Sequence, residues 1–177
     1  MAHQGQEIVN SRTGQRMTFV ELSYDTLRID SINPAGVDGR EPLHIHPKQV
    51  SGAEVLAGGL VFEVDGERRP VDAGESISIP AGTVHRFWNE GDEDAHSIHS
   101  FRPALDIADF FETLFALANA GELDAKGMPK LLQLAVMVPE FGDEIRPVSP
   151  PWPVLQALTA VLAPIARARG YRARSSS

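Results

Sequence analysis

The chain contains no cysteine. Disulfide bonds, thiolate metal ligands and cysteine nucleophiles are therefore excluded, and nothing in the chain depends on the redox state of its compartment. No apolar run reaches the roughly 20 residues that a membrane-spanning helix needs. The first residues also lack the basic and then apolar order of a secretory signal. We therefore expect a cytoplasmic protein with no membrane partner.

Positive charge is scarce, and the formal net charge is −8 at pH 7. Phosphate binding needs clustered lysine and arginine, so nucleic acid is not an expected partner. One basic cluster stands near the end, at Arg167, Arg169, Arg172 and Arg174, before Ser175–Ser177. Such basic ends are usually solvated tails, and an anionic partner is the alternative.

Turn residues cut the chain from about Glu7 to Pro103 into short β-like segments. Residues 60–64 and 67–71 flank Asp65-Gly66, which supplies the positive φ angles of a tight hairpin turn. Residues 76–79 alternate polar and apolar side chains, as strands with one buried face do. The fold class expected for this half is mainly β, a sandwich or barrel of antiparallel strands.

The pattern changes after Pro103, where apolar residues recur at helical spacing over about 105–118, followed by Gly121 as a stop. We expect a second helix over about 129–138 and a third apolar segment over 154–166 that Pro164 interrupts. The expected domains are a barrel at 1–103 and a helical extension at 104–177. The extension is expected to pack on the barrel or to form a homodimer contact.

Two histidines, His44 and His46, flank one residue in a strand-like segment, so both imidazoles lie on the same face. Such a pair is also common as half-buried, hydrogen-bonded histidine. His85 adds a third imidazole, because it follows the turn Pro80-Ala81-Gly82 at the start of another strand. Three histidines from two strands favour a metal site over a structural role.

With these residues the sequence resembles the cupin superfamily. The second cupin motif, Gly-x5-Pro-x-Gly-x2-His-x3-Asn, is matched at every position, by Gly74, Pro80, Gly82, His85 and Asn89. The first motif, His-x-His-x3-4-Glu-x6-Gly, is matched by His44, His46 and Gly58. The resemblance implies a double-stranded β-helix (jelly-roll) barrel with a divalent metal on His44, His46 and His85, here followed by an α-helical appendage.

The glutamate of the first motif is missing. Its two allowed positions hold Val50 and Ser51, and counting back from Gly58 selects Ser51. Gln49 lies on the same strand face as Ser51 and is a candidate fourth ligand or pocket residue with it, whereas Glu54 has the opposite parity. Three neutral ligands leave more open positions on a metal, and loss of the metal altogether is the alternative.

The resemblance implies three classes of function on a small-molecule substrate or ligand. The first is an iron(II) dioxygenase acting on a diketone, phenolic or flavonoid-like compound, as in three-histidine cupin dioxygenases. The second is a polyketide-type cyclase or isomerase with a Lewis-acid metal, and the third is a barrel that binds a small molecule without turnover. Fe²⁺ is the expected metal, with Zn²⁺, Ni²⁺, Mn²⁺ and Cu²⁺ as alternatives. His96 and His99 have opposite parity, so at most one of them faces the interior.

Overall fold

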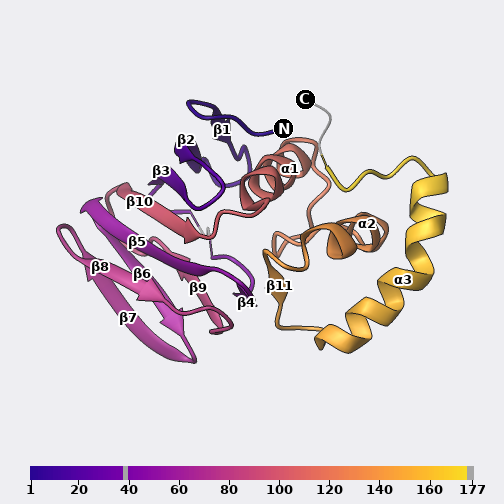
Figure 1. The fold of residues 1–177 in the computed structure, drawn as a ribbon. Coiled ribbons are helices and arrows are strands. Elements are labelled where there is room, and N and C mark those ends of the chain that lie inside the picture. Colours follow the sequence, from indigo (N-terminus) through magenta and orange to yellow (C-terminus); the bar gives the residue numbers. More distant parts are fainter. Residues whose placement is uncertain (38–39, 175–177) are drawn as a thin grey trace.

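A computed structural model describes residues 1–37 and 40–174. Short strands make up the chain as far as residue 102, and helices with one short strand among them follow after residue 106 (Figure 1). In chain order they are β1 Glu7–Val9, β2 Arg16–Leu22, β3 Leu27–Asn33, β4 His44–Ile45, β5 Val50–Ala57, β6 Gly59–Val64, β7 Glu67–Asp72, β8 Ser76–Ile79, β9 His85–Trp88, β10 Ala95–Arg102, α1 Ile107–Asn119, α2 Leu131–Phe141, β11 Arg146–Pro147 and α3 Trp152–Ala168.

Within the described residues the strands form two antiparallel sheets that face each other as a jelly-roll barrel. One sheet has the order β1-β2-β3-β10-β5-β8 and the other β11-β4-β9-β6-β7. Their facing sides share an apolar core in which Val55 and Ala95 of the first sheet meet Leu60 and Phe62 of the second. The mainly β jelly-roll expected from the turn spacing and the motifs is confirmed, with helices at its C-terminal end.

The predicted hairpin is present between β6 and β7, where Val64 pairs with Glu67. Asp65 and Gly66 have φ angles of 51° and 81°. Two consecutive positive φ angles are what a type I′ turn requires, and its twist matches that of the strands it joins. The hairpin forms one edge of the smaller sheet, at the opposite edge from β11 and β4.

Helix α1 packs on the larger sheet and shares a core cluster with it. The inner face of the larger sheet presents Leu27, Ile29 and Phe101 there, and α1 packs Ile107 and Phe111 against them. Both Leu27 and Ile107 are fully buried. Helix α2 continues this layer through a ring contact between Phe110 and Phe141, whose centroids are 5.6 Å apart.

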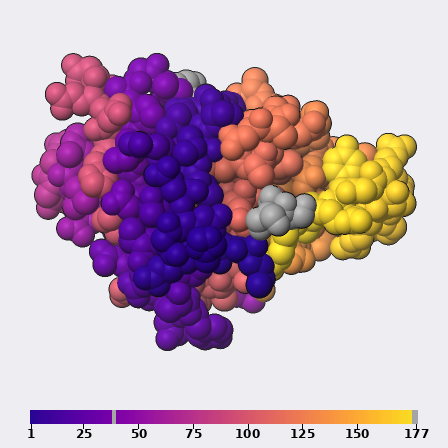
Figure 2. Space-filling view, turned by 90° about the horizontal axis from the view of Figure 1, so that it is seen from above, coloured from indigo at the N-terminus to yellow at the C-terminus, as the bar shows by residue number. Residues whose placement is uncertain are grey.

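Helix α3 lies outermost, where it packs on α2 through a small cluster of Ala135, Val136 and Ala166 (Figures 1 and 2). The predicted interruption at Pro164 is wrong, because α3 continues through that residue. Pro164 and Ala160 are both on the exposed side, so the carbonyl group that proline leaves without a helical partner faces water. Helix α2 likewise continues past its predicted end, through Pro139 to Phe141.

The C-terminal segment is held against the molecule and is not a solvated tail as far as Arg174. The Arg174 guanidinium donates to Asp106 and Glu140, each at 2.6 Å, and also contacts Asp109. The expectation of a solvated basic end is therefore wrong for this arginine, and Ser175–Ser177 lie outside the described residues. Among the helices of the described ranges, none combines the length and the apolar character needed to cross a bilayer.

The extension also completes the barrel at one edge. Strand β11 pairs with β4, placing Arg146 opposite Ile45 and Pro147 opposite His44. A strand from the predicted extension thus lies beside the first histidine motif. The proposed division at residues 103 and 104 stays a prediction.

Candidate metal centre

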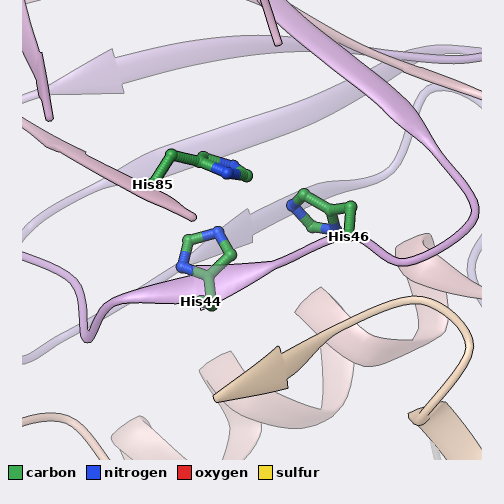
Figure 3. Close-up of side chains that lie close together, drawn as sticks. All are labelled: His44, His46 and His85. Atoms are coloured by element: carbon green, nitrogen blue, oxygen red, sulfur yellow. The ribbon is translucent and has the colours of Figure 1, made fainter. Parts of the chain in front are cut away.

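The three motif histidines meet inside the barrel (Figure 3). His44 opens β4 and pairs directly with His85, the first residue of β9. His46 follows β4, and its backbone carbonyl accepts a hydrogen bond from the Gly82 N–H at 2.9 Å. Gly82 has a φ angle of +79°, which glycine adopts without strain, so the turn before His85 is tied to His46.

The same atom of each imidazole is bound to the backbone. Nδ1 of His44 lies 2.9 Å from the Pro42 carbonyl oxygen, and Nδ1 of His85 lies 2.9 Å from that of Thr83. Nδ1 of His46 lies 2.6 Å from the carbonyl oxygen of Glu144. A carbonyl oxygen only accepts, so Nδ1 donates its hydrogen in all three rings. Each neutral ring therefore presents Nε2 as an unprotonated lone pair.

These lone pairs converge in a buried place. One nitrogen from each ring lies within 4.8 Å of the other two. Burial lowers the pKa of all three histidines, that of His46 to about 4, and for His44 the neighbouring His46 and His85 lower it further. The rings are thus neutral at pH 7. Three acceptors that face one another without a hydrogen between them fit a divalent cation, which suits imidazole nitrogen.

Strand alternation points the side chains of Ser51 and Val50 to opposite faces of β5. Val50 is 47% exposed, whereas Ser51 is 6% exposed and lines the cavity beside the histidines. The Ser51 hydroxyl has no hydrogen-bond partner among the described residues. Of the two positions at which the motif glutamate is missing, Ser51 is therefore the one that faces inward. Glu54 is exposed, as its opposite parity predicted.

Gln49 is fully buried on the same side of the chain. Its amide nitrogen donates to the carbonyl oxygens of Pro103 and Ala104, at 2.9 and 2.8 Å. Its amide oxygen lacks a hydrogen-bond partner in the described ranges. The Gln49 side chain thus anchors the connection between β10 and α1, and both it and Ser51 stay predictions as metal ligands.

A cavity of about 170 Å³ opens from the three histidines. It runs between the sheets and under the helical layer, so α1 and α2 contribute to its wall. Aromatic rings from the barrel and from α1 line it, namely Phe62, Phe87, Phe101, Phe110, Phe111 and Phe115. A largely apolar cavity beside a cluster of ligating nitrogens is the usual form of a small-molecule site.

Two acidic residues near the histidines went unnoticed in the sequence. Glu41 lies in an irregular segment and lines the cavity, and burial raises the pKa of its carboxyl group to about 8. Glu144 precedes β11, and its backbone carbonyl holds His46. Neither residue belongs to a motif or a periodic pattern. Glu41 stands three residues before His44, whereas only the chain's path in space brings Glu144 to the site.

The alternation predicted for β10 is confirmed. His96 points outward and its Nε2 lies 3.0 Å from an Asp30 carboxylate oxygen. His99 points inward, is 7% exposed and lines the cavity. Its ring packs on Phe87 with centroids 4.7 Å apart.

Comparison with known proteins places the barrel in a family. Residues 34–101 match the family model described as Cupin domain. The matched segment, which holds all three histidines, is therefore a cupin domain. KdgF from Halomonas sp. has a similar solved structure, with a TM-score of 0.51 and 20% identity over 58% of this chain and 92% of that one. This likeness concerns the fold.

Two curated relatives match parts of the chain. The chain is 37% identical over 60 residues to the polyketide synthase CurC of Streptomyces cyaneus, covering 34% of this chain and 39% of that protein. It is 44% identical over 46 residues to quercetin 2,3-dioxygenase of Bacillus subtilis (strain 168), covering 26% of this chain and 14% of that protein. The matched parts thus span well under two thirds of either relative.

Replacing His99 by phenylalanine is expected to make the fold less sensitive to acid. Burial lowers the pKa of His99 from 6.5 to about 4. The stability contributed by the neutral ring is therefore complete above pH 6.5 and is lost as the pH falls toward 4. The advantage of His99→Phe in unfolding free energy should be about 2 kcal/mol larger at pH 5 than at pH 7.5. Urea unfolding of both metal-stripped proteins measures it, and equal pH dependence would contradict the burial of a neutral ring.

Proposed function

We propose that this chain is a metal-dependent dioxygenase in which His44, His46 and His85 hold Fe²⁺. Its substrate would be a diketone, a phenolic or a flavonoid-like small molecule. The observation that carries this proposal is the set of three buried, neutral imidazoles whose Nδ1 atoms are all engaged by backbone carbonyls. Similarity to a quercetin dioxygenase over 46 residues supports the reaction class.

The residues of the chain would prepare the site in three ways. The carbonyls of Pro42, Thr83 and Glu144 fix the tautomer and the direction of each ring. The aromatic wall keeps water away and matches a planar substrate. Bound there, iron would supply Lewis acidity and electron transfer toward oxygen. Without the motif glutamate, the protein leaves more of the metal's positions to substrate.

A second candidate is a polyketide-type cyclase or isomerase that uses the metal only as a Lewis acid. The similarity to the polyketide synthase CurC over 60 residues favours it. A third candidate, a barrel that binds without turnover, is supported by the missing glutamate. Substrate loss under air and under argon separates the three. Fe²⁺-loaded protein is mixed with quercetin or 2,4-pentanedione under air and under argon, and substrate loss is followed. A dioxygenase acts only under air, a cyclase acts in both, and a binding protein in neither.

Alanine at His44, His46 or His85 is expected to remove the metal and to leave a folded barrel. Each change deletes one of three ligands, so the loss in affinity should exceed the roughly 10- to 100-fold caused by losing a supporting partner. Metal content after dialysis, measured by elemental analysis, checks this. His96→Ala is the matched control because His96 points outward to Asp30, and it should keep its metal. A motif variant with full metal content would remove that histidine from the site.

Glutamate at position 51 is expected to tighten metal binding and to lower turnover. The side chain at this position faces the cavity, so a carboxylate there would fill a position that substrate or oxygen needs. Metal affinity and oxygen consumption are compared for Ser51→Glu and for the control Ser51→Ala. If the natural protein holds no metal and Ser51→Glu does, the dioxygenase proposal fails and the binding protein replaces it.

We also propose that the chain forms a homodimer through α3. Its outer face exposes Val154, Leu158, Val161 and Ile165, by 56%, 40%, 70% and 46%. This spacing is that of a coiled-coil seam, and the sequence from Trp152 to Ala166 carries no charged side chain. A two-fold axis would bury the same stripe on both copies.

Val161→Glu is expected to convert the dimer into a monomer, because two like charges would meet in an apolar seam. Light scattering after gel filtration gives the mass of each form. Val20→Glu is the control, since Val20 is 39% exposed on β2, in the barrel and away from this stripe. A monomeric natural protein at micromolar concentration would contradict the proposed contact.

A further inference from the structure

His99 is a buried polar residue that the fold itself leaves unsatisfied. Its side chain is only 7% exposed, and its Nε2 atom has no hydrogen-bond partner in the part of the chain that the structure describes. A buried polar atom without a partner costs about 1 to 3 kcal/mol. A phenylalanine would pack against Phe87 without that cost. The histidine therefore points to a partner that is not part of the chain.

His99 is linked to the three-histidine cluster through one phenylalanine on each of two strands. Phe87 follows His85 by two residues on β9 and contacts His99, with ring centroids 4.7 Å apart. Phe101 follows His99 by two residues on β10 and contacts His46, at 5.2 Å. Inward side chains that are two residues apart on a strand are separated by about 6.6 to 6.8 Å. A single six-membered ring with a substituent spans such a distance.

The cavity as a whole has room for about one ring. The cavity measures about 170 Å³. An engineered apolar cavity of about 150 Å³ is large enough for benzene. The rings of Phe62 and Phe87 stack on each other in its wall, with centroids 5.4 Å apart, and offer a flat apolar surface. The walls therefore favour a planar, largely apolar ligand over a sugar, whose many hydroxyl groups would lack partners.

The charges around the cavity favour a ligand that enters uncharged. Among its described lining residues, the cations Arg12, Arg40 and Lys126 all come from connecting segments and none from a barrel strand. A carboxylate or phosphate near His99 would therefore be buried without a counter-charge. A neutral imidazole offers one donor and one acceptor, which suit a hydroxyl or carbonyl group.

We infer that His99 is the ligand-recognition residue of this cavity. It hydrogen-bonds a hydroxyl or carbonyl group of a neutral, planar, single-ring ligand whose second oxygen, across the ring, faces His44, His46 and His85. The position of the second oxygen rests on the proposed metal site. The bond to His99 does not, because it needs only the cavity.

A cycle of two ligands and two proteins tests the inference. Hydroquinone carries a hydroxyl group at both ends of the ring, and phenol carries one. Binding of each to Zn²⁺-loaded protein is measured by calorimetry, since zinc does not oxidise either. Natural protein should bind hydroquinone about tenfold tighter than phenol, as one added hydrogen bond predicts. In His99→Phe the two affinities should become equal, and His99→Gln, which keeps a donor and an acceptor, should restore part of the difference. To protein without zinc, benzoate should bind more weakly than phenol, because its carboxylate would be buried without a counter-charge.

Two controls accompany the cycle. His99→Phe should keep its zinc and should unfold no more easily than the natural protein, so that a lost preference reflects a lost contact. The measurements are repeated without zinc, where either ligand can turn a hydroxyl group to His99, so that both affinities should be lower in His99→Phe than in the natural protein. A natural protein that takes up no zinc would overturn the proposed metal site alone. Equal binding of the two ligands by the natural protein, or a preference that survives in His99→Phe, would overturn the role of His99.

Discussion

The candidate site depends on three hydrogen bonds from imidazole Nδ1 atoms to backbone carbonyls. Without them, a buried histidine would rotate or exchange its tautomer, and its Nε2 lone pair would have no fixed direction. Two of these carbonyls, those of Pro42 and Thr83, belong to residues two positions before the histidine that they hold. The third, at Glu144, comes from the far end of the chain. Backbone carbonyls both near and distant in sequence thus orient the three imidazole rings toward one point.

The charge of the site follows from the same arrangement. All three imidazoles are neutral at pH 7, because burial lowers their pKa values. A divalent ion among them would bring two positive charges into an apolar interior with no ligand carboxylate to offset them. Such a site favours ligands that can lose a proton on binding, as enols and phenols do. The absence of the motif glutamate therefore bears on the ligand as well as on the metal.

Much of this arrangement could be predicted from the sequence. The alternation of β10 correctly predicted that at most one of His96 and His99 faces the interior, and the Asp65-Gly66 turn correctly identified the β6–β7 hairpin. Motif spacing correctly predicted that His44, His46 and His85 lie together. These features are local, or are governed by a spacing that fixes which side of a strand each residue occupies.

What could not be predicted depends on long-range packing. No pattern near Glu144 indicates that its carbonyl meets a histidine almost a hundred positions earlier, with a sequence separation of 98. Pro164 has the local signature of a helix break, yet its exposed side lets water satisfy the freed carbonyl. Arg174 has the sequence context of a solvated tail, yet Asp106 before α1, Asp109 on α1 and Glu140 on α2 hold it in place. For Glu144 and Arg174 a neighbour distant in sequence decides the outcome, and for Pro164 the exposure of that side of α3 to water does.

The contact between His46 and Glu144 links the cluster to the helical extension thermodynamically. Strand β11 and the Glu144 carbonyl are held beside β4 only while the segment between α2 and α3 is folded there. A ligand can favour the state in which His46 Nδ1 is bonded to the Glu144 carbonyl. Such a ligand must stabilise that segment by the same free energy, because linkage is reciprocal. The extension would then exchange its amide hydrogens more slowly in the loaded protein. Amide exchange in the helical extension would therefore show whether the histidine site in the barrel is occupied.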